Sequence, residues 1–184
     1  MGRPQEAPSA LGDASPFRFA IVVSRFNQAI TDSLRDAAVG ALAEAGAAAS
    51  QVDRFEVPGA YELPQAARAA AASGAYDAIV CLGCVVRGET PHFDYISAAV
   101  AHGIMDAAGD TGVPMAFGVL TVDTQAQAVA RAGTGPDNKG REAAAAAIEM
   151  ALVYRKIEAA RKARKARKAR SARRTRRTRR SGGS

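Results

Sequence analysis

Short unbroken apolar runs alternate along the chain with longer segments in which apolar residues recur every three or four positions. Such runs are typical of strands that are buried on both faces, as in a parallel sheet. The spaced segments are typical of helices that bury one face. The pattern predicts strands at residues 17–23, 77–84 and 115–121, and a further strand is predicted at residues 51–57, where Pro58 and Gly59 end it.

A helix is predicted after each strand. The first carries Ile30, Leu34, Ala38 and Leu42 at helical spacing and ends near Gly46. The others are predicted at residues 60–74, from residue 90 onward, at residues 124–132, and from about residue 138. Because strand and helix alternate four times, we expect a doubly wound, three-layer α/β/α sandwich around a four-stranded parallel sheet.

Length and composition favour one domain with extensions. The chain has 184 residues, of which 48% are hydrophobic, enough for a single core. Residues 1–16 mix Pro, Gly, Ser and Ala without periodicity, which predicts a flexible arm. We expect the α/β domain to cover residues 17–160, followed by a disordered, low-complexity basic tail at residues 161–184.

Charge is divided unevenly between these parts. Thirteen of the 25 Lys and Arg residues lie in residues 161–180, whereas all 18 acidic residues lie before residue 161. The formal charge of +7 therefore combines −6 on the body, from 12 basic and 18 acidic residues, with +13 on the tail. An Arg-rich run is suited to a polyanion such as nucleic acid, although a solubilising extension is the ordinary alternative.

Neither a membrane span nor a secretory signal is predicted. No apolar run reaches the roughly 18 to 20 residues that cross a bilayer, and the N-terminal segment lacks a hydrophobic signal core. We therefore expect a cytoplasmic protein. Cys81 and Cys84 have a C-x-x-C spacing, but an odd separation on a strand sends side chains to opposite faces, so we expect two reduced core thiols.

The segment after the third strand carries the most distinctive candidate chemistry. Thr90 and Pro91 are predicted to be the N-cap and the first residue of a helix. Free backbone N–H groups at that end, together with Gly88 and the Thr90 hydroxyl, are suited to binding a phosphate. His92 lies in the same turn and could transfer a proton near neutral pH, although an ordinary, partly exposed histidine is the alternative.

Aromatic and polar residues also follow the other strands. Phe26 comes after the first strand, where it could cap the core or stack on a flat heterocycle, and Tyr61 and Glu62 come after the second. We expect these segments, the loop before His92 and the segment from Thr121 onward to form one rim, because the carboxyl ends of parallel strands share one edge. A nucleoside triphosphate ligand is not expected, because the chain contains no P-loop or dinucleotide motif.

Six motifs connect the chain to a known family: SRFN (residues 24–27), VPGAYELP (57–64), GETPHFDY (88–95), FGVLT (117–121), RAGT (131–134) and NKG (138–140). In this order the chain resembles 6,7-dimethyl-8-ribityllumazine synthases over residues 17–157. The resemblance implies a flavodoxin-like fold whose N-terminal arm and first strand contact a neighbouring subunit. It also implies a transferase of riboflavin biosynthesis that condenses 5-amino-6-(D-ribitylamino)uracil with 3,4-dihydroxy-2-butanone 4-phosphate and releases phosphate, without a metal or cofactor.

The same resemblance implies roles for individual residues. Those that would bind the pyrimidine and the ribityl chain are Phe26, Ala60, Tyr61, Glu62, Cys84, Val85 and Val86. Those that would bind the phosphate are Glu89, Thr90 and Arg131, although a surface ion pair is the ordinary alternative for the arginine. His92 would move protons, Phe117 from a neighbouring subunit would close the pocket, and Lys139 would lie near the substrates.

Assembly is also implied by the resemblance. We expect a homo-oligomer, either a pentamer or an icosahedral shell of pentamers. The family often has a basic residue and a glycine between Thr134 and Asn138, in the loop that bears on how pentamers assemble. This chain has Gly135, Pro136 and Asp137 there, which makes the loop stiffer and acidic.

Two other hypotheses concern different classes of protein. The tail favours an oligomeric shell that binds or packages nucleic acid, with or without retained activity. A flavodoxin-like flavin binder would be yellow and would form no product. A shell freed from catalysis has no physical need for Phe26, Glu62, His92 and Arg131 together, which favours the enzyme.

Overall fold

The computed structural model of the chain describes residues 11–181 and contains a four-stranded, all-parallel sheet. Its strands are β1 (Phe19–Ser24), β2 (Val52–Val57), β3 (Ala78–Val86) and β4 (Met115–Val122), and their order across the sheet is β2-β1-β3-β4. Each of the four predicted strands is confirmed to within two residues at either end. The register places Phe19 of β1 between Val52 and Ala78.

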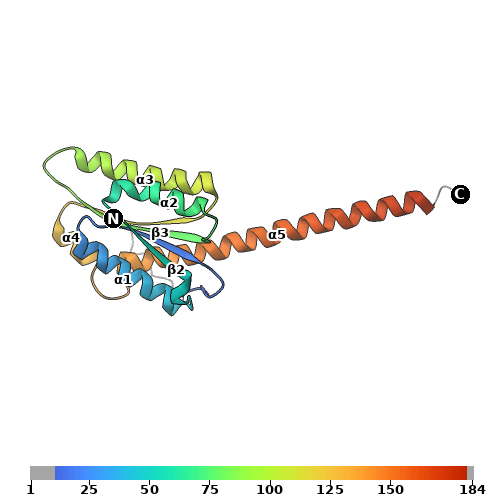
Figure 1. The fold of residues 1–184 in the computed structure, drawn as a ribbon, viewed down its shortest axis with the longest axis horizontal. Coiled ribbons are helices and arrows are strands. Elements are labelled where there is room, and N and C mark those ends of the chain that lie inside the picture. The colour runs from blue at the N-terminus through green and yellow to red at the C-terminus, as the bar shows by residue number, and fades with distance from the viewer. Residues whose placement is uncertain (1–10, 182–184) are drawn as a thin grey trace, which may run out of the picture. The chain divides into compact units, whose positions relative to one another are not determined.

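Helices cover both faces of this sheet, which confirms the predicted three-layer sandwich (Figure 1). The helices are α1 (Gln28–Glu44), α2 (Leu63–Ala72), α3 (His92–Thr111), α4 (Gln125–Arg131) and α5 (Lys139–Ser181), with short 3₁₀ turns η1 (Ala49–Gln51) and η2 (Ala60–Glu62). Helices α2 and α3 cover one face, and α1, α4 and the beginning of α5 cover the other.

The core explains why β1 is almost continuously apolar. All six residues of β1 are buried, since side chains on both of its faces are covered by helices. Ala20 and Val22 pack in one cluster with Leu63 of α2 and Val100 of α3. The alternate residues, such as Ile21, point to the opposite face, because side chains alternate along a strand.

The structure describes the chain only from residue 11 to residue 181. Residues 1–10 of the predicted flexible arm, and residues 182–184 of the predicted tail, lie outside the described residues. The end of the arm is held on the body, since Ala14 is fully buried and its N–H donates to the Ala45 carbonyl at 2.8 Å.

Helix α5 belongs to two units. The chain separates into a body that ends at Ala151 and a second unit that begins at Leu152. Within the body, α5 buries Ala144, Ala147 and Ile148. From residue 161 the structure differs from the disorder that the sequence favours, because α5 continues as a helix to Ser181. Ala, Lys and Arg are strong helix formers, which is the physical basis for this helix.

Between residues 11 and 181, no helix combines the length and the apolar content that crossing a bilayer requires.

Candidate active site

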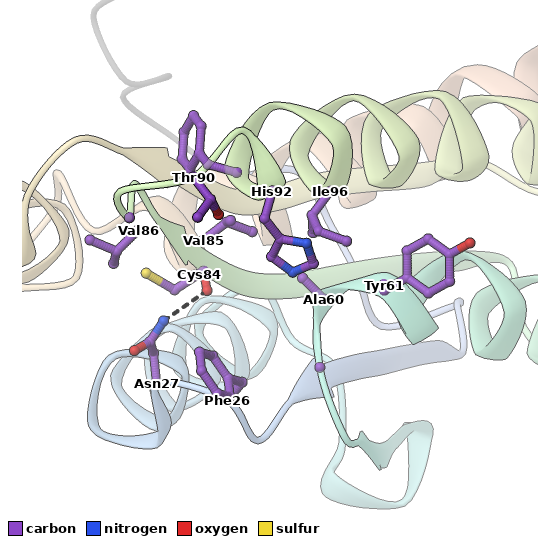
Figure 2. A pocket seen from close by; sticks show the side chains of 13 residues that line it. Phe26, Asn27, Ala60, Tyr61, Cys84, Val85, Val86, Thr90, His92 and Ile96 are labelled. Atoms are coloured by element: carbon purple, nitrogen blue, oxygen red, sulfur yellow. Dashed lines mark hydrogen bonds between the residues drawn. The ribbon is translucent and has the colours of Figure 1, made fainter.

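A cavity of about 410 Å³ lies at the carboxyl ends of β1, β2 and β3 (Figure 2). After β1 the chain continues to β2 on one side of β1, whereas β3 lies on the other side. The order of the strands therefore reverses at β1, and open α/β sheets bind their ligands at the carboxyl ends of the strands where the order reverses. We call it the strand-end cavity. Its lining residues are Phe26, Asn27, Gly59, Ala60, Tyr61, Cys84, Val85, Val86, Gly88, Thr90, His92, Phe93 and Ile96.

Phe26 lies in the turn between β1 and α1 and lines this cavity rather than capping the core. The residue is 69% exposed, so its ring is accessible to a ligand. Figure 2 shows the ring across the cavity from His92. An exposed aromatic ring beside a cavity is suited to stacking on a flat ligand.

Asn27 is a cavity residue that the sequence analysis did not single out. It has φ 59° and ψ 46°, a left-handed conformation that Asn tolerates better than most residues. Its Nδ2 donates to the Cys84 carbonyl at 3.0 Å, and Figure 2 shows this bond as a dashed line. Asn27 therefore ties the end of β1 to the end of β3. The one available signal was an asparagine at a turn between a strand and a helix.

The turn after β2 is fixed by Glu62. Its Oε2 accepts a hydrogen bond from the Gly59 N–H at 2.9 Å, which holds the turn before α2. Ala60 is buried and Tyr61 is 61% exposed, and both line the strand-end cavity. Glu62 does not belong to the lining set, so in the isolated chain its visible role is to shape the turn.

The end of β3 offers backbone groups rather than a reactive thiol. Burial raises the pKa of Cys84 to about 11, so the thiol stays protonated near neutral pH and is a poor nucleophile. Burial likewise raises the pKa of Cys81 to about 12. Both cysteines are free and buried, which confirms the prediction of two unpaired core thiols. Val85 and Val86 are half-buried and line the cavity.

The start of α3 corrects one sequence prediction. Thr90 is not the N-cap, because α3 begins at His92, Pro91 occupies the cap position, and the helix has no side-chain cap. The Pro91 carbonyl accepts hydrogen bonds from the N–H groups of Asp94 and Tyr95 at 3.0 and 3.4 Å. The Thr90 hydroxyl is therefore not used as a helix cap, and Thr90 and Gly88 are exposed at the cavity.

Arg87 holds this loop in place. Its guanidinium pairs with Asp94 of α3 at 3.1 Å and with Asp123, just after β4, at 2.9 Å, and it stacks 4.1 Å from the centre of the Phe93 ring. Hydrogen bonds with Asp94 and then Asp123 raise the Arg87 pKa. Arg87 thus links three segments while the next residues of the loop face the cavity.

His92 is exposed at the first residue of α3. Its ring points toward the turn that carries Ala60 (Figure 2). Within residues 11–181 the imidazole has no hydrogen-bond partner, so both ring nitrogens are free to meet a ligand.

Three other predicted site residues lie elsewhere. Phe117, Arg131 and Lys139 share a second hollow of about 380 Å³ beside β4 and α5, which we call the β4 hollow. Phe117 is 45% exposed. Arg131 donates to the Gln127 carbonyl at 3.1 Å, and Lys139 pairs with Glu142 at 2.6 Å.

Of the four strand ends that were expected to form one rim, the end of β4 lies beside the loop after β3, where Asp123 pairs with Arg87, but it does not line the strand-end cavity. Only the ends of β1, β2 and β3 meet at the strand-end cavity, whereas Thr121 lines the β4 hollow. The reason is the strand order, which places β4 at the edge of the sheet with β3 between it and β1. Arg131 and Thr90 accordingly line different cavities of one chain.

Among the side chains that the structure describes, no group of three or more His, Cys, Asp and Glu residues is placed to hold a metal ion.

Comparison with known proteins gives consistent matches. Residues 16–155 match the family model for 6,7-dimethyl-8-ribityllumazine synthase. The chain is 51% identical over 144 residues to the 6,7-dimethyl-8-ribityllumazine synthase of Syntrophus aciditrophicus, covering 78% of this chain and 94% of that protein. It is 52% identical over 141 residues to the enzyme of the same name from Salinibacter ruber, covering 77% of this chain and 90% of that protein.

Proposed function

The chain belongs to the 6,7-dimethyl-8-ribityllumazine synthase family, whose reaction condenses 5-amino-6-(D-ribitylamino)uracil with 3,4-dihydroxy-2-butanone 4-phosphate, and we propose that the strand-end cavity is where this chain carries it out. The observation that supports this location is one cavity of about 410 Å³ that joins Phe26, the turn at Ala60, the end of β3 and His92. A cavity of this size is typical of small-molecule sites.

The pyrimidine substrate binds between Phe26 and the end of β3. The exposed Phe26 ring stacks on the flat heterocycle, and the backbone of Cys84, Val85 and Val86 meets its polar edge. The turn at Ala60–Glu62 holds the ribityl chain, with Glu62 keeping the turn in shape through Gly59. Backbone recognition of this kind depends on the strand end being held rigidly.

His92 transfers protons during the condensation. In forming the imine the attacking amine loses two protons, and the ketone oxygen gains two as it leaves as water. The imidazole lines the cavity without a hydrogen-bond partner in the described chain, so it is free for both transfers. No covalent enzyme nucleophile is needed, because holding the two substrates together supplies much of the rate.

The phosphate substrate binds at the loop that carries Gly88, Glu89 and Thr90. Gly88 and Thr90 are exposed at the cavity near the start of α3, where backbone N–H groups favour an anion. Arg131 supplies the positive charge. In the described chain its only hydrogen bond is to a backbone carbonyl, and no carboxylate neutralises it.

The complete site lies between subunits of a homo-oligomer. Phe117, Arg131 and Lys139 share the β4 hollow, whereas the other site residues line the strand-end cavity. One copy placed with its β4 hollow against the strand-end cavity of the next completes the site, and cyclic repetition of this heterologous contact gives a closed ring. We propose a pentamer, or an icosahedral shell of pentamers, built in this way.

The test is to mix the purified protein with both substrates and follow lumazine absorbance and phosphate release. We expect the two products to form together, and neither to form when either substrate is left out. Intact substrates in the presence of folded protein would refute the proposal. A yellow protein that retains flavin without turnover would instead support a flavin binder.

A further inference from the structure

The family match ends at residue 155, before the most strongly charged part of the chain begins. We call residues 161–180 the basic segment. It contains 13 Lys and Arg residues and no acidic residue. The proposed condensation makes no use of it, because all residues of the strand-end cavity and the β4 hollow come from the body.

The helical backbone gives the basic segment a high linear charge density. At about 1.5 Å per residue, its 20 residues extend roughly 30 Å, or one positive charge every 2.3 Å or so. Duplex nucleic acid carries one negative charge per roughly 1.7 Å of its axis. Every residue from 161 to 168 is exposed, so the charges in this part are available to a partner.

The order of residues spreads the charge around the helix. Basic residues occupy two of every three positions through most of the segment, and a repeat of three shifts by about 60° per repeat on a helix of 3.6 residues per turn. Basic residues therefore occur on all sides. No apolar residue larger than alanine interrupts them, so the segment has no apolar face for a lipid bilayer or a hydrophobic groove.

Nothing within the segment neutralises this charge. Glu158 pairs with Arg161 at 3.2 Å. Beyond Lys162 no acidic residue lies within four positions of any basic one, so helical ion pairs between neighbouring turns cannot form. The anions that balance the charge of the basic segment must therefore come from outside it.

The acidic body also carries carboxylates, but many of them are paired within the body. One hollow of the body is lined by Asp32, Asp36 and Glu44, among other residues. All three carboxylates already have basic partners within the body: Arg35 pairs with both aspartates, and Arg141 pairs with Glu44. A partner that carries many uncompensated phosphates fits the segment better.

We propose that the basic segment binds nucleic acid through its phosphate backbone, without preference for sequence. The segment has no aromatic residue to stack on bases, so phosphate contacts provide the binding. Single-stranded RNA and duplex DNA share this chemistry and both bind. The binding is independent of the condensation activity.

The test uses the full chain after nuclease treatment and a high-salt wash. Its affinity for a labelled uridine 20-mer RNA and for two 20-base-pair DNA duplexes of unrelated sequence is measured by fluorescence anisotropy at several salt concentrations. Both duplexes should bind equally. Affinity should fall by about 10³-fold or more between 50 and 200 mM salt, as expected for six or more phosphate contacts.

Truncation after Glu158 is the first control. It should abolish binding and lower the 260/280 nm absorbance ratio of the purified protein, while condensation activity and the melting temperature stay unchanged. Equal nucleic-acid binding by the full and truncated chains would overturn the proposal and leave a solubilising extension. Tighter binding to phosphatidylserine vesicles than to either nucleic acid would also overturn it.

Two matched variants test whether binding depends on the number of basic residues and not on their position in the segment. One replaces Arg161, Lys162, Arg164, Lys165, Arg167 and Lys168 by Gln, and the other replaces Arg173, Arg174, Arg176, Arg177, Arg179 and Arg180 by Gln. Each removes six charges and keeps the length of the chain. Both should reduce the salt dependence by roughly half, because that dependence follows the number of phosphates neutralised. Loss of binding in one variant alone would refute uniform backbone recognition.

Discussion

The imidazole of His92 is placed to exchange protons with a ligand, because it faces the strand-end cavity and has no partner in the described chain. We predict that His92→Ala lowers kcat by a factor on the order of 10² or less, since the proximity of the two substrates survives. His102→Ala is the matched control, because that residue is also exposed on α3 but does not line the cavity. Full activity of the His92 variant would show that another group moves the protons.

Asn27 controls the shape of the backbone that meets the pyrimidine. Asn27→Asp keeps the size of the side chain and tolerates the left-handed backbone, but its carboxylate cannot donate to the Cys84 carbonyl. A hydrogen bond of this kind contributes about 0.5–1.5 kcal/mol, so we predict that KM for the pyrimidine rises roughly 3- to 10-fold while kcat changes less.

The variant Asn27→Gly distinguishes the effect of the left-handed backbone at residue 27 from the effect of its side-chain amide. Glycine adopts the left-handed conformation freely but has no side chain to donate. Its KM for the pyrimidine should rise as well, while KM for the phosphate substrate stays near the wild-type value. Wild-type KM values in both variants would show that the bond to Cys84 does not position the substrate.

Cys81 gives the fold a pH dependence. Burial raises its pKa from 9.0 to about 12, so the folded protein holds this proton more tightly than the unfolded chain does. The resulting stabilisation is complete below about pH 8.5 and is lost as pH rises from there toward the folded value. We predict that Cys81→Ala is less stable than the wild type at pH 7, and that the gap narrows above pH 9. Urea unfolding at several pH values measures the difference in unfolding free energy between the two proteins. A difference that does not change with pH would contradict the raised pKa of Cys81.

At the scale of elements, α5 fits against α1 through a glycine. A β-carbon at Gly140 would overlap the backbone of Leu34, whereas one at Gly109 of α3 would meet no atom within 4 Å. We predict that Gly140→Ala lowers the free energy of unfolding by about 1–3 kcal/mol or more, because the two helices must separate. Gly109→Ala should be neutral or stabilising by up to about 1 kcal/mol, since alanine favours helix. Chemical denaturation measures the unfolding free energy of both variants. Equal changes in the two would refute the close contact between Gly140 and the backbone of Leu34.

Helices and strands were easier to predict from the sequence than the contacts between residues of different elements. Strands such as β3 are unbroken apolar runs, which is why the sequence locates them closely. The loop before His92 also lies at a cavity, as expected. The Asn27 to Cys84 bond joins residues far apart in the chain, and the separation of Arg131 from Thr90 follows from the strand order. Neither leaves a local pattern in the sequence.

At the scale of the whole molecule, the two separate hollows make a prediction about assembly. If a site combines His92 of one subunit with Arg131 of the next, the variants His92→Ala and Arg131→Ala each damage every site in their own oligomer. Mixed oligomers contain some interfaces with both residues intact. We predict that co-refolded mixtures recover activity, up to roughly a quarter of the wild-type value with random mixing in a closed ring.

The control for this recovery is an equimolar mixture of the two variants without refolding. That mixture should show only the mean of the separate activities, because each oligomer in it was assembled from one variant alone. Light scattering should report an oligomer throughout. Absence of recovery from co-refolded oligomers, or a monomer with full activity, would place the whole site within one chain.

The central position of β1 affects how the chain matures during synthesis. β1 is the first strand to be made, yet it pairs with both β2 and β3, and the second partner begins only at Ala78. Gly118 of β4 packs against Ala143 of α5, so the sheet is not covered until α5 has been translated. A nascent chain therefore lacks one partner of its apolar first strand until β3 ends at Val86, and it leaves the sheet partly uncovered until α5 is made, when mispairing with other chains is most dangerous. A premature stop before Ile148 should yield a fragment for proteases and chaperones rather than a weakened enzyme.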